Sequence, residues 1–141
     1  MSTVNMQTLA TGLNTVITRL GRRIRRIDDR QDIGRARLSA LSVLVFGGPS
    51  TLSELAADEM VSPATMHHVV NGLITLKFAR KKPDRTDKRR STIEATKAGH
   101  RFMEQARQAR LDFYIGKLEA LTDRERKVVA DFVLLANPWY S

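Results

Sequence analysis

Apolar residues recur at steps of three and four along most of this chain, the spacing that gives an α-helix one apolar face. The longest stripe lies at the beginning of the chain, and several shorter ones follow it. The pattern therefore predicts a mainly α-helical protein. The expected helices cover about residues 4–27, 35–46, 52–59, 63–76, 97–118 and 123–137.

Local signals place the ends of these helices. Ser62 followed by Pro63 is an N-cap serine with a proline at the first helical position. Residues 51–54 and 122–125 have the spacing of a capping box, in which Thr and Glu side chains satisfy free amides at a helix start. Residues 47–49, Gly-Gly-Pro, end the helix before them. The two middle helices are therefore expected to be short and joined by a tight turn.

Residues 78–81 and 91–95 break the helical pattern and are predicted as two short strands. The segment between them, residues 82–90, is too charged for a core and is expected to be a hairpin tip, or wing. Two short helices followed by a basic hairpin have the order of a winged helix-turn-helix, which we expect over residues 35–96. The fold class is therefore mainly α with a small β-wing.

The terminal segments hold more apolar helix than this small reading part can cover. A long exposed apolar stripe is an interaction surface, so residues 1–30 and 97–141 are predicted to form the helical dimerisation part of one domain, residues 1–141. Packing of the stripes within one chain is the alternative. The residues expected at the dimer interface are Leu9, Leu13, Val16, Leu20, Phe113, Val129, Phe132 and Val133.

The chain carries 24 Lys and Arg residues against 15 Asp and Glu residues, a net charge of +9. Such an excess favours a polyanionic partner, either nucleic acid or an anionic membrane surface. Residues 80–90 alone contain seven basic residues and two aspartates, although a solvated hairpin tip is an alternative interpretation. The arginines of the first helix either form its solvated face or attract an anionic effector; they are Arg19, Arg22, Arg23, Arg25 and Arg26.

The second short helix is the candidate reading helix. An α-helix fits the major groove of DNA, and its N-terminal residues reach the base edges. No carboxylate lies between Val61 and Arg80, so nothing on this helix repels phosphate. The outward residues predicted to contact DNA are Ser62, Pro63, Ala64, Thr65, His67, His68 and Asn71. For the two histidines, a plain surface position is the alternative.

The hairpin adds a second set of predicted DNA contacts. An arginine at a hairpin tip is slim enough for a narrow minor groove, where the negative potential is strongest. Asp87 is expected to steer a neighbouring arginine and not to touch DNA. The basic residues of this set are Lys81, Lys82, Arg85, Lys88, Arg89 and Arg90.

Several segments together resemble a known family. They are residues 51–56, 61–65 and 78–80, and most specifically Asp-Arg-Thr-Asp-Lys-Arg at 84–89 with Thr-Lys-Ala-Gly at 96–99. The chain is similar over nearly its whole length to the MarR (multiple antibiotic resistance regulator) family of bacterial transcription factors. Those last two segments match the family's Asp-x-Arg wing and Thr-x-x-Gly helix start.

The resemblance implies a triangular homodimer in which the first, fifth and sixth helices interlock. It also implies binding of a palindromic operator, usually repression, and often relief by a small, commonly aromatic, anionic ligand. It assigns Arg89 to the minor groove and Asp87 to holding the wing. Thr65, His67 and His68 fall at the family's base- and phosphate-contacting positions.

The chain departs from the family at two positions. Lys77 stands where the family usually has a glycine, and a lysine with positive φ there would cost about 1 kcal/mol. Ala95 replaces the usual leucine before Thr96 and is expected to anchor its strand less well. Neither departure touches the predicted DNA contacts.

Other classes of site find little support in the sequence. The chain has no cysteine, which excludes disulfides and thiolate sites. His67 and His68 diverge by about 100° on a helix and do not face one metal ion, and His100 has no evident partner. The sequence contains neither a glycine-rich phosphate loop nor a carboxylate pair that would indicate an enzyme. No catalysis, cofactor or metal is therefore expected.

The sequence predicts a cytoplasmic protein. It has no secretion signal at the N-terminus and no apolar run of the ~18–20 residues that a membrane span needs. We expect a sequence-specific regulator of double-stranded DNA, a homodimeric repressor with a small-molecule effector as a further partner. The alternative is a nonspecific architectural DNA-binding protein, for which charge and dimerisation suffice.

Overall fold

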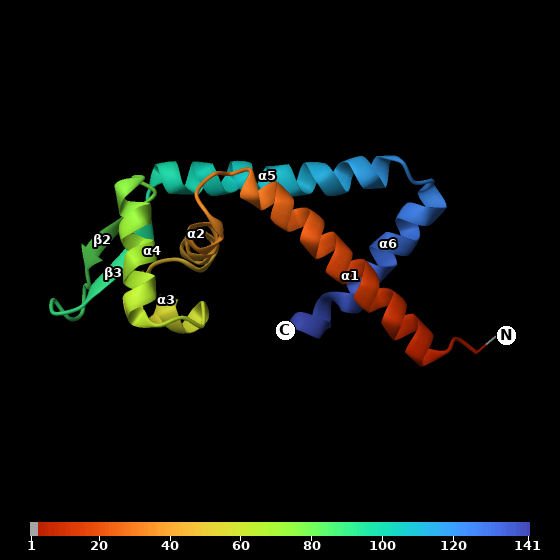
Figure 1. The fold of residues 1–141 in the computed structure, drawn as a ribbon, viewed down its shortest axis with the longest axis horizontal. Helices are drawn as coiled ribbons and strands as arrows, with labels where there is room; N and C mark the ends of the chain where they lie inside the picture. Colours follow the sequence, from red (N-terminus) through yellow and green to blue (C-terminus); the bar gives the residue numbers. More distant parts are fainter. Residues whose placement is uncertain (1–2) are drawn as a thin grey trace. The chain divides into compact units, whose positions relative to one another are not determined.

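The computed structural model describes residues 3–141, and the chain divides into two compact units, one ending at Arg107 and the other beginning at Gln108. The fold is mainly α with one small antiparallel sheet, which confirms the predicted fold class (Figure 1). The first unit holds α1 (Met6–Asp29), α2 (Arg35–Gly47), β1 (Ser50–Thr51), α3 (Leu52–Asp58), α4 (Pro63–Thr75), β2 (Ala79–Pro83), β3 (Ser91–Ala95) and the start of α5 (Lys97–Glu119). The second unit holds the rest of α5, then α6 (Asp123–Ala136) and the 3₁₀ turn η1 (Asn137–Tyr140).

Side-chain caps begin the helices where the sequence predicts. Ser62 accepts a hydrogen bond from the amide of Thr65 at 3.1 Å and starts α4. At α6 the capping box of Thr122 and Glu125 is complete in both directions. The box expected at the start of α3 forms only in part, because Glu54 is engaged by the hydroxyl of Ser50 at 3.4 Å and not by the backbone at Thr51.

The core of the first unit lies between α2, α3, α4 and the sheet. Leu41, Leu55, Val70, Leu73 and Ile93 are fully buried there, and the four that lie on helices come from the apolar positions that the sequence predicts to face inward. Apolar burial of this kind is the main source of stability in a domain. It fixes the orientation of α4 and so decides which of its residues face solvent.

The sheet has the strand order β1-β3-β2, and both pairings are antiparallel. β2 pairs with β3 from Ala79 opposite Ala95 to Pro83 opposite Ser91. The prediction that the hairpin tip begins at residue 82 is therefore wrong, since Lys82 and Pro83 continue the strand. β1 was not expected from the sequence, because two residues give no periodicity to recognise.

The end of α4 shows what Lys77 does in place of a glycine. Lys77 adopts a φ of 64°, so the left-handed conformation expected for that position is present. The amide of Phe78 donates to the carbonyl of Leu73 at 2.9 Å, and the amide of Lys77 donates to Ile74 at 2.9 Å. These two bonds form a Schellman motif, which turns the chain directly from α4 into β2.

The start of α5 is fastened to this same turn. The hydroxyl of Thr96 donates to the carbonyl of Lys77 at 2.6 Å and accepts from the amide of Gly99 at 3.1 Å. The rings of Phe78 and Phe102 stack with their centroids 4.6 Å apart. The wing and the reading helix are thus held together at the base of the hairpin.

Candidate nucleic-acid interface

The outer face of α4 is small, polar and free of acids. Met66, Val69, Val70 and Leu73 are buried against the core, which turns the rest of the helix outward. No carboxylate occurs from the N-cap of α4 to the start of β2. The residues predicted to contact DNA are all exposed on this helix; they are Ser62, Pro63, Ala64, Thr65, His67, His68 and Asn71.

Two hydroxyls at the N-terminus of α4 are coupled. Ser62 accepts from the amide of Thr65, and its own hydroxyl donates to Oγ1 of Thr65 at 2.9 Å. The hydroxyl of Ser62 is therefore occupied within the protein, whereas Thr65 keeps its hydrogen to donate. A phosphate oxygen or a base acceptor fits that remaining donor.

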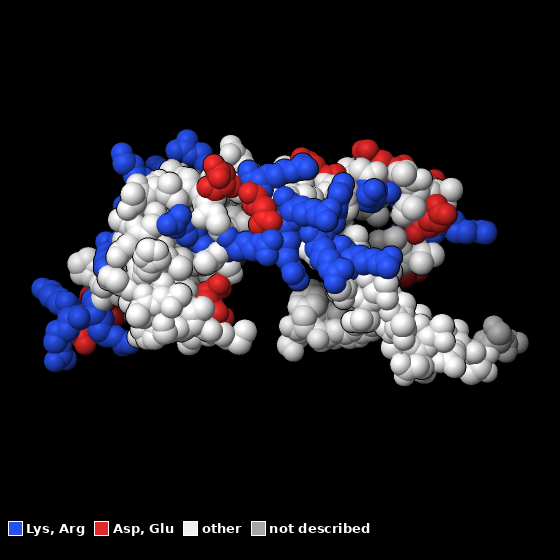
Figure 2. Space-filling model, in the orientation of Figure 1, with Lys and Arg blue, Asp and Glu red and all other residues white. Residues whose placement is uncertain are grey.

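The wing is a hairpin of β2 and β3 that packs against α4 at its base and projects from the helices (Figure 1). Its outer end is strongly basic, and Figure 2 shows Lys and Arg side chains gathered there with few acids among them. Lys81 and Lys82 lie on β2, whereas the other predicted contacts lie in the turn and are exposed; these are Arg85, Lys88, Arg89 and Arg90.

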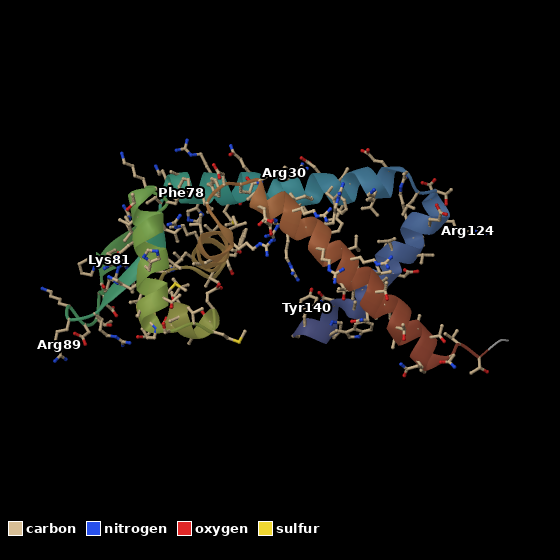
Figure 3. The ribbon with its side chains drawn as sticks, in the orientation of Figure 1. Arg30, Phe78, Lys81, Arg89, Arg124 and Tyr140 are labelled. Carbon is tan, nitrogen blue, oxygen red and sulfur yellow. The ribbon has the colours of Figure 1, made fainter. Side chains whose placement is uncertain are left out.

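A carboxylate holds the arginine at the far end of the wing. Oδ1 of Asp87 accepts from the backbone amide of Arg89 at 3.0 Å and from its Nε at 3.3 Å. The side chain of Arg89 is nevertheless 91% exposed, and Figure 3 places it at the outer end of the hairpin. The contact that the sequence predicts between Asp87 and a neighbouring arginine is therefore present in the structure.

A second aspartate shapes the turn and was missed in the sequence. Oδ1 of Asp84 accepts from both the amide and the hydroxyl of Thr86 at 3.1 Å. These hydrogen bonds from Thr86 hold the pKa of the Asp84 carboxyl below its usual range. An aspartate in a short polar turn is the signal of an Asx-turn, in which the carboxylate accepts from the amide two residues on, and it would have identified Asp84 as a structural residue.

Glu94 on β3 was also missed, because it lies beyond the run of basic residues. Its Oε1 accepts from Nε of Arg80 at 2.5 Å and lies 3.9 Å from Nζ of Lys82. The two basic residues are on the strand opposite, where cross-strand pairs meet. Glu94 thus offsets part of the positive charge at the base of the wing and leaves the tip as its more basic end.

Comparisons with known proteins give the relatives of this chain. No protein-family model matches it. The helix-turn-helix-type transcriptional regulator Mb0904 of Mycobacterium bovis is 30% identical over 129 aligned positions, and the match covers 89% of this chain and 90% of that protein. The regulator ML2140 of Mycobacterium leprae is 29% identical over 129 residues, with the same coverage of both chains.

Solved structures share the fold. RV1404 from Mycobacterium tuberculosis matches with a TM-score of 0.84 at 19% identity, over 98% of this chain and 96% of that one. A MarR family protein from Bacillus stearothermophilus matches with a TM-score of 0.79 at 20% identity, over 98% and 99% of the two chains. The chain belongs to the MarR family of helix-turn-helix transcriptional regulators. A mutant of the S. aureus regulator MepR, bound to an oligodeoxyribonucleotide, matches with a TM-score of 0.71 at 15% identity, over 94% and 98% of the chains.

This MarR-family chain carries exposed apolar side chains on both of its terminal segments. On α1, Leu9 is 56% and Val16 is 54% exposed, and on α6, Val133 is 60% exposed. Large apolar side chains that are exposed together on one helix face are typical of surfaces that another molecule covers. The remaining residues predicted for dimerisation are exposed or half-buried; they are Leu13, Leu20, Phe113, Val129 and Phe132.

Neither a metal-holding cluster nor a membrane-spanning helix occurs in the part of this regulator that the structure describes. Over residues 3–141, no three His, Asp or Glu side chains are grouped so that they could hold a metal ion. Within the same residues, every helix is too short or too polar to cross a membrane.

Proposed function

We propose that this MarR-family regulator is a homodimeric repressor that binds a palindromic operator in double-stranded DNA. The observation that carries the proposal is the outer face of α4. It is small and polar, has no carboxylate, and is fixed by the core beside a basic hairpin. A helix with these properties fits the major groove, where a single acid would repel the phosphates.

Helix α4 and the wing contribute differently to DNA binding. Thr65, His67 and His68 in the major groove supply the sequence preference, together with Arg89 in the minor groove. Contacts to phosphates supply affinity that falls steeply as salt rises. The residues proposed for these phosphate contacts are Lys81, Lys82, Arg85, Lys88 and Arg90, all exposed in the structure.

The exposed apolar residues of α1 and α6 support the proposed dimer. Two reading helices related by a dyad would address half-sites about one turn of DNA apart, roughly 10 base pairs. The complex of a MepR mutant with an oligodeoxyribonucleotide, a structure with the same fold, supports DNA as the partner. We further propose that a small aromatic or anionic ligand releases the DNA by favouring a dimer with different spacing, and that the protein acts in the cytoplasm.

The proposal is tested with a footprint on the DNA upstream of the protein's own coding region. We expect protection of two half-sites related by a dyad. A competition assay then compares this duplex with a scrambled duplex of equal length. A regulator prefers its operator by about 10³-fold or more, whereas an architectural protein is displaced equally by both. Equal competition would overturn the proposal in favour of the architectural alternative.

A further inference from the structure

An open pocket of about 350 Å³ lies where α2 passes α4, within the first unit. Only one of the side chains lining it is a full cation, Arg37 on α2, and the remaining lining residues are on α4 or at its C-cap. Two of those, His68 and Asn71, already belong to the predicted DNA-contacting face. The complete lining is Arg37, His68, Asn71, Gly72, Thr75 and Leu76.

The side chain of Arg37 lies directly over Gly72. A methyl group built on Gly72 would come within 2.8 Å of Cζ and Nη2 of Arg37, which is closer than real carbon contacts allow. Gly72 is interior to α4, where glycine is a poor helix former compared with alanine. The absence of a side chain at this position is what lets the guanidinium rest against the reading helix.

Arg37 has no acidic partner among residues 3–141, and no lining residue of the pocket is acidic. Its neighbour Arg35 differs, because Nε and Nη2 of Arg35 donate to the two carboxylate oxygens of Asp29 at 2.8 Å. The guanidinium of Arg37 therefore keeps its paired N–H donors for an anion. Paired donors of this kind match two oxygens of one phosphate.

We infer that this pocket binds a phosphate of the DNA backbone beside the groove that α4 enters, with Arg37 as its main donor. His68 and Asn71 of α4, which also line the pocket, add further hydrogen-bond donors. The inference rests on the proposed function and adds to it a contact from α2. Such a contact fixes the depth and register of α4 without reading a base.

The first test compares wild type with Arg37→Ala in fluorescence anisotropy with a labelled operator duplex and a scrambled duplex. A phosphate contact made by each protomer predicts at least a roughly tenfold loss on both duplexes. The slope of log K against log salt should become shallower by about 1.8, or about 0.9 for each phosphate. The matched control is Arg124→Ala, which removes the same charge from an exposed position on α6 and should leave the slope unchanged.

The second test displaces Arg37 without removing it. Gly72→Ala should push the guanidinium off the helix, at little cost because the atoms that must move are the end of a flexible side chain. We expect the melting temperature to stay or rise, since alanine is the better helix former, while DNA affinity falls. In the double variant Arg37→Ala/Gly72→Ala the losses should not add, because both changes remove one contact. Additive losses would overturn the role of Gly72.

The source of the phosphate is tested separately. In a series of operator duplexes, each with one neutral methylphosphonate linkage, one position should weaken wild type and leave Arg37→Ala unaffected. Inorganic phosphate at constant ionic strength should displace the duplex from neither protein. Equal responses of the two proteins at every linkage position would overturn the backbone contact, and displacement by inorganic phosphate from wild type alone would then assign the pocket to a free anion. If wild type prefers its operator over the scrambled duplex and Arg37→Ala binds that operator as tightly as wild type, only the Arg37 contact is ruled out. If wild type shows no preference between the two duplexes, the proposed function is ruled out.

Discussion

Asp87 and Arg89 form an ion pair at the end of the wing, so a carboxylate lies within the surface proposed to bind the phosphates of DNA. The carboxylate accepts from the backbone and from the guanidinium of Arg89, and so limits the directions in which that side chain points. Holding a long side chain in one direction reduces the conformational entropy that binding would otherwise cost. The pair therefore separates two effects, the charge of the wing and the position of its arginine.

Replacing either member of this pair tests that separation. Arg89→Ala should weaken operator binding by about 1–3 kcal/mol. Asp87→Ala raises the net charge of the chain by one, yet we expect it to weaken operator binding as well, because Arg89 loses its anchor. On a scrambled duplex Asp87→Ala should bind as well as wild type or better. Anisotropy titrations measure both, and tighter operator binding by Asp87→Ala would show that only charge matters in the wing.

Met60 lies in the turn between α3 and α4 with a φ of 54°, and the residue is 91% exposed. A residue with a Cβ is strained there, whereas a glycine is not. Met60→Gly should therefore raise the free energy of unfolding by about 1 kcal/mol, and no packing is lost. Met60→Ala keeps the Cβ and serves as the control, with no gain expected. Urea unfolding followed by circular dichroism measures the difference, and equal stability of the two variants would exclude strain at this turn.

At the scale of elements, the joint between β2 and α5 depends on Gly99. A Cβ on Gly99 would lie 3.0 Å from the carbonyl carbon of Phe78, closer still to its oxygen, and 3.3 Å from Cδ1 of Leu41. The nearest of these atoms belong to the backbone of Phe78, which cannot move aside by a side-chain rotation. Gly99→Ala should therefore destabilise the protein by about 1–3 kcal/mol, the range for overpacking.

Gly116 provides the matched control for that change on the same helix. A Cβ there meets nothing within 4 Å in a single chain, so Gly116→Ala should stabilise α5 by about 0.5–1 kcal/mol. Chemical unfolding measures the change in the free energy of unfolding for each substitution. A decrease for Gly99→Ala with an increase for Gly116→Ala would show that the close approach to Phe78 requires the glycine. A stable Gly99→Ala variant would contradict this account.

The sequence predicts the helices of this fold well, because their apolar stripes and caps are local. Ser62 and Thr122 cap the helices that they were expected to cap. The errors occur where a partner distant in sequence decides the structure. β1 exists because Ser50 pairs with Ile93, and the same pairing holds Ser50, whose hydroxyl engages Glu54 four residues on.

The candidate site follows the same rule. The polar face of α4 and the basic wing are each continuous in sequence, and both could be recognised there. Arg37 could not, since it approaches Gly72 only after α2 and α4 have packed on their shared core. Glu94 was missed for a similar reason, because its partners lie on the opposite strand. Apart from the local turn at Asp84, contacts between elements are therefore what the structure adds to the site.

At the scale of the whole molecule, the proposal needs two chains to bind one operator. Val133 is 60% exposed on α6, and an aspartate there places a charge on the apolar surface proposed to meet the second copy. Val133→Asp should therefore yield a folded monomer, identified by analytical ultracentrifugation and by an unchanged far-ultraviolet spectrum. The control is Arg124→Asp, which introduces the same residue on the opposite face of α6 and should leave the dimer intact.

The salt dependence of DNA binding links this dimer to the wing. If each wing neutralises four or five phosphates, the slope of log K against log salt for the dimer is about −7 to −9. A monomer carries one wing, so Val133→Asp should show about half that slope, together with weaker binding to the operator. Arg124→Asp should keep the full slope. A monomeric Val133→Asp with the slope of wild type would mean that a single chain makes all the phosphate contacts, and the paired arrangement would then be unnecessary for binding.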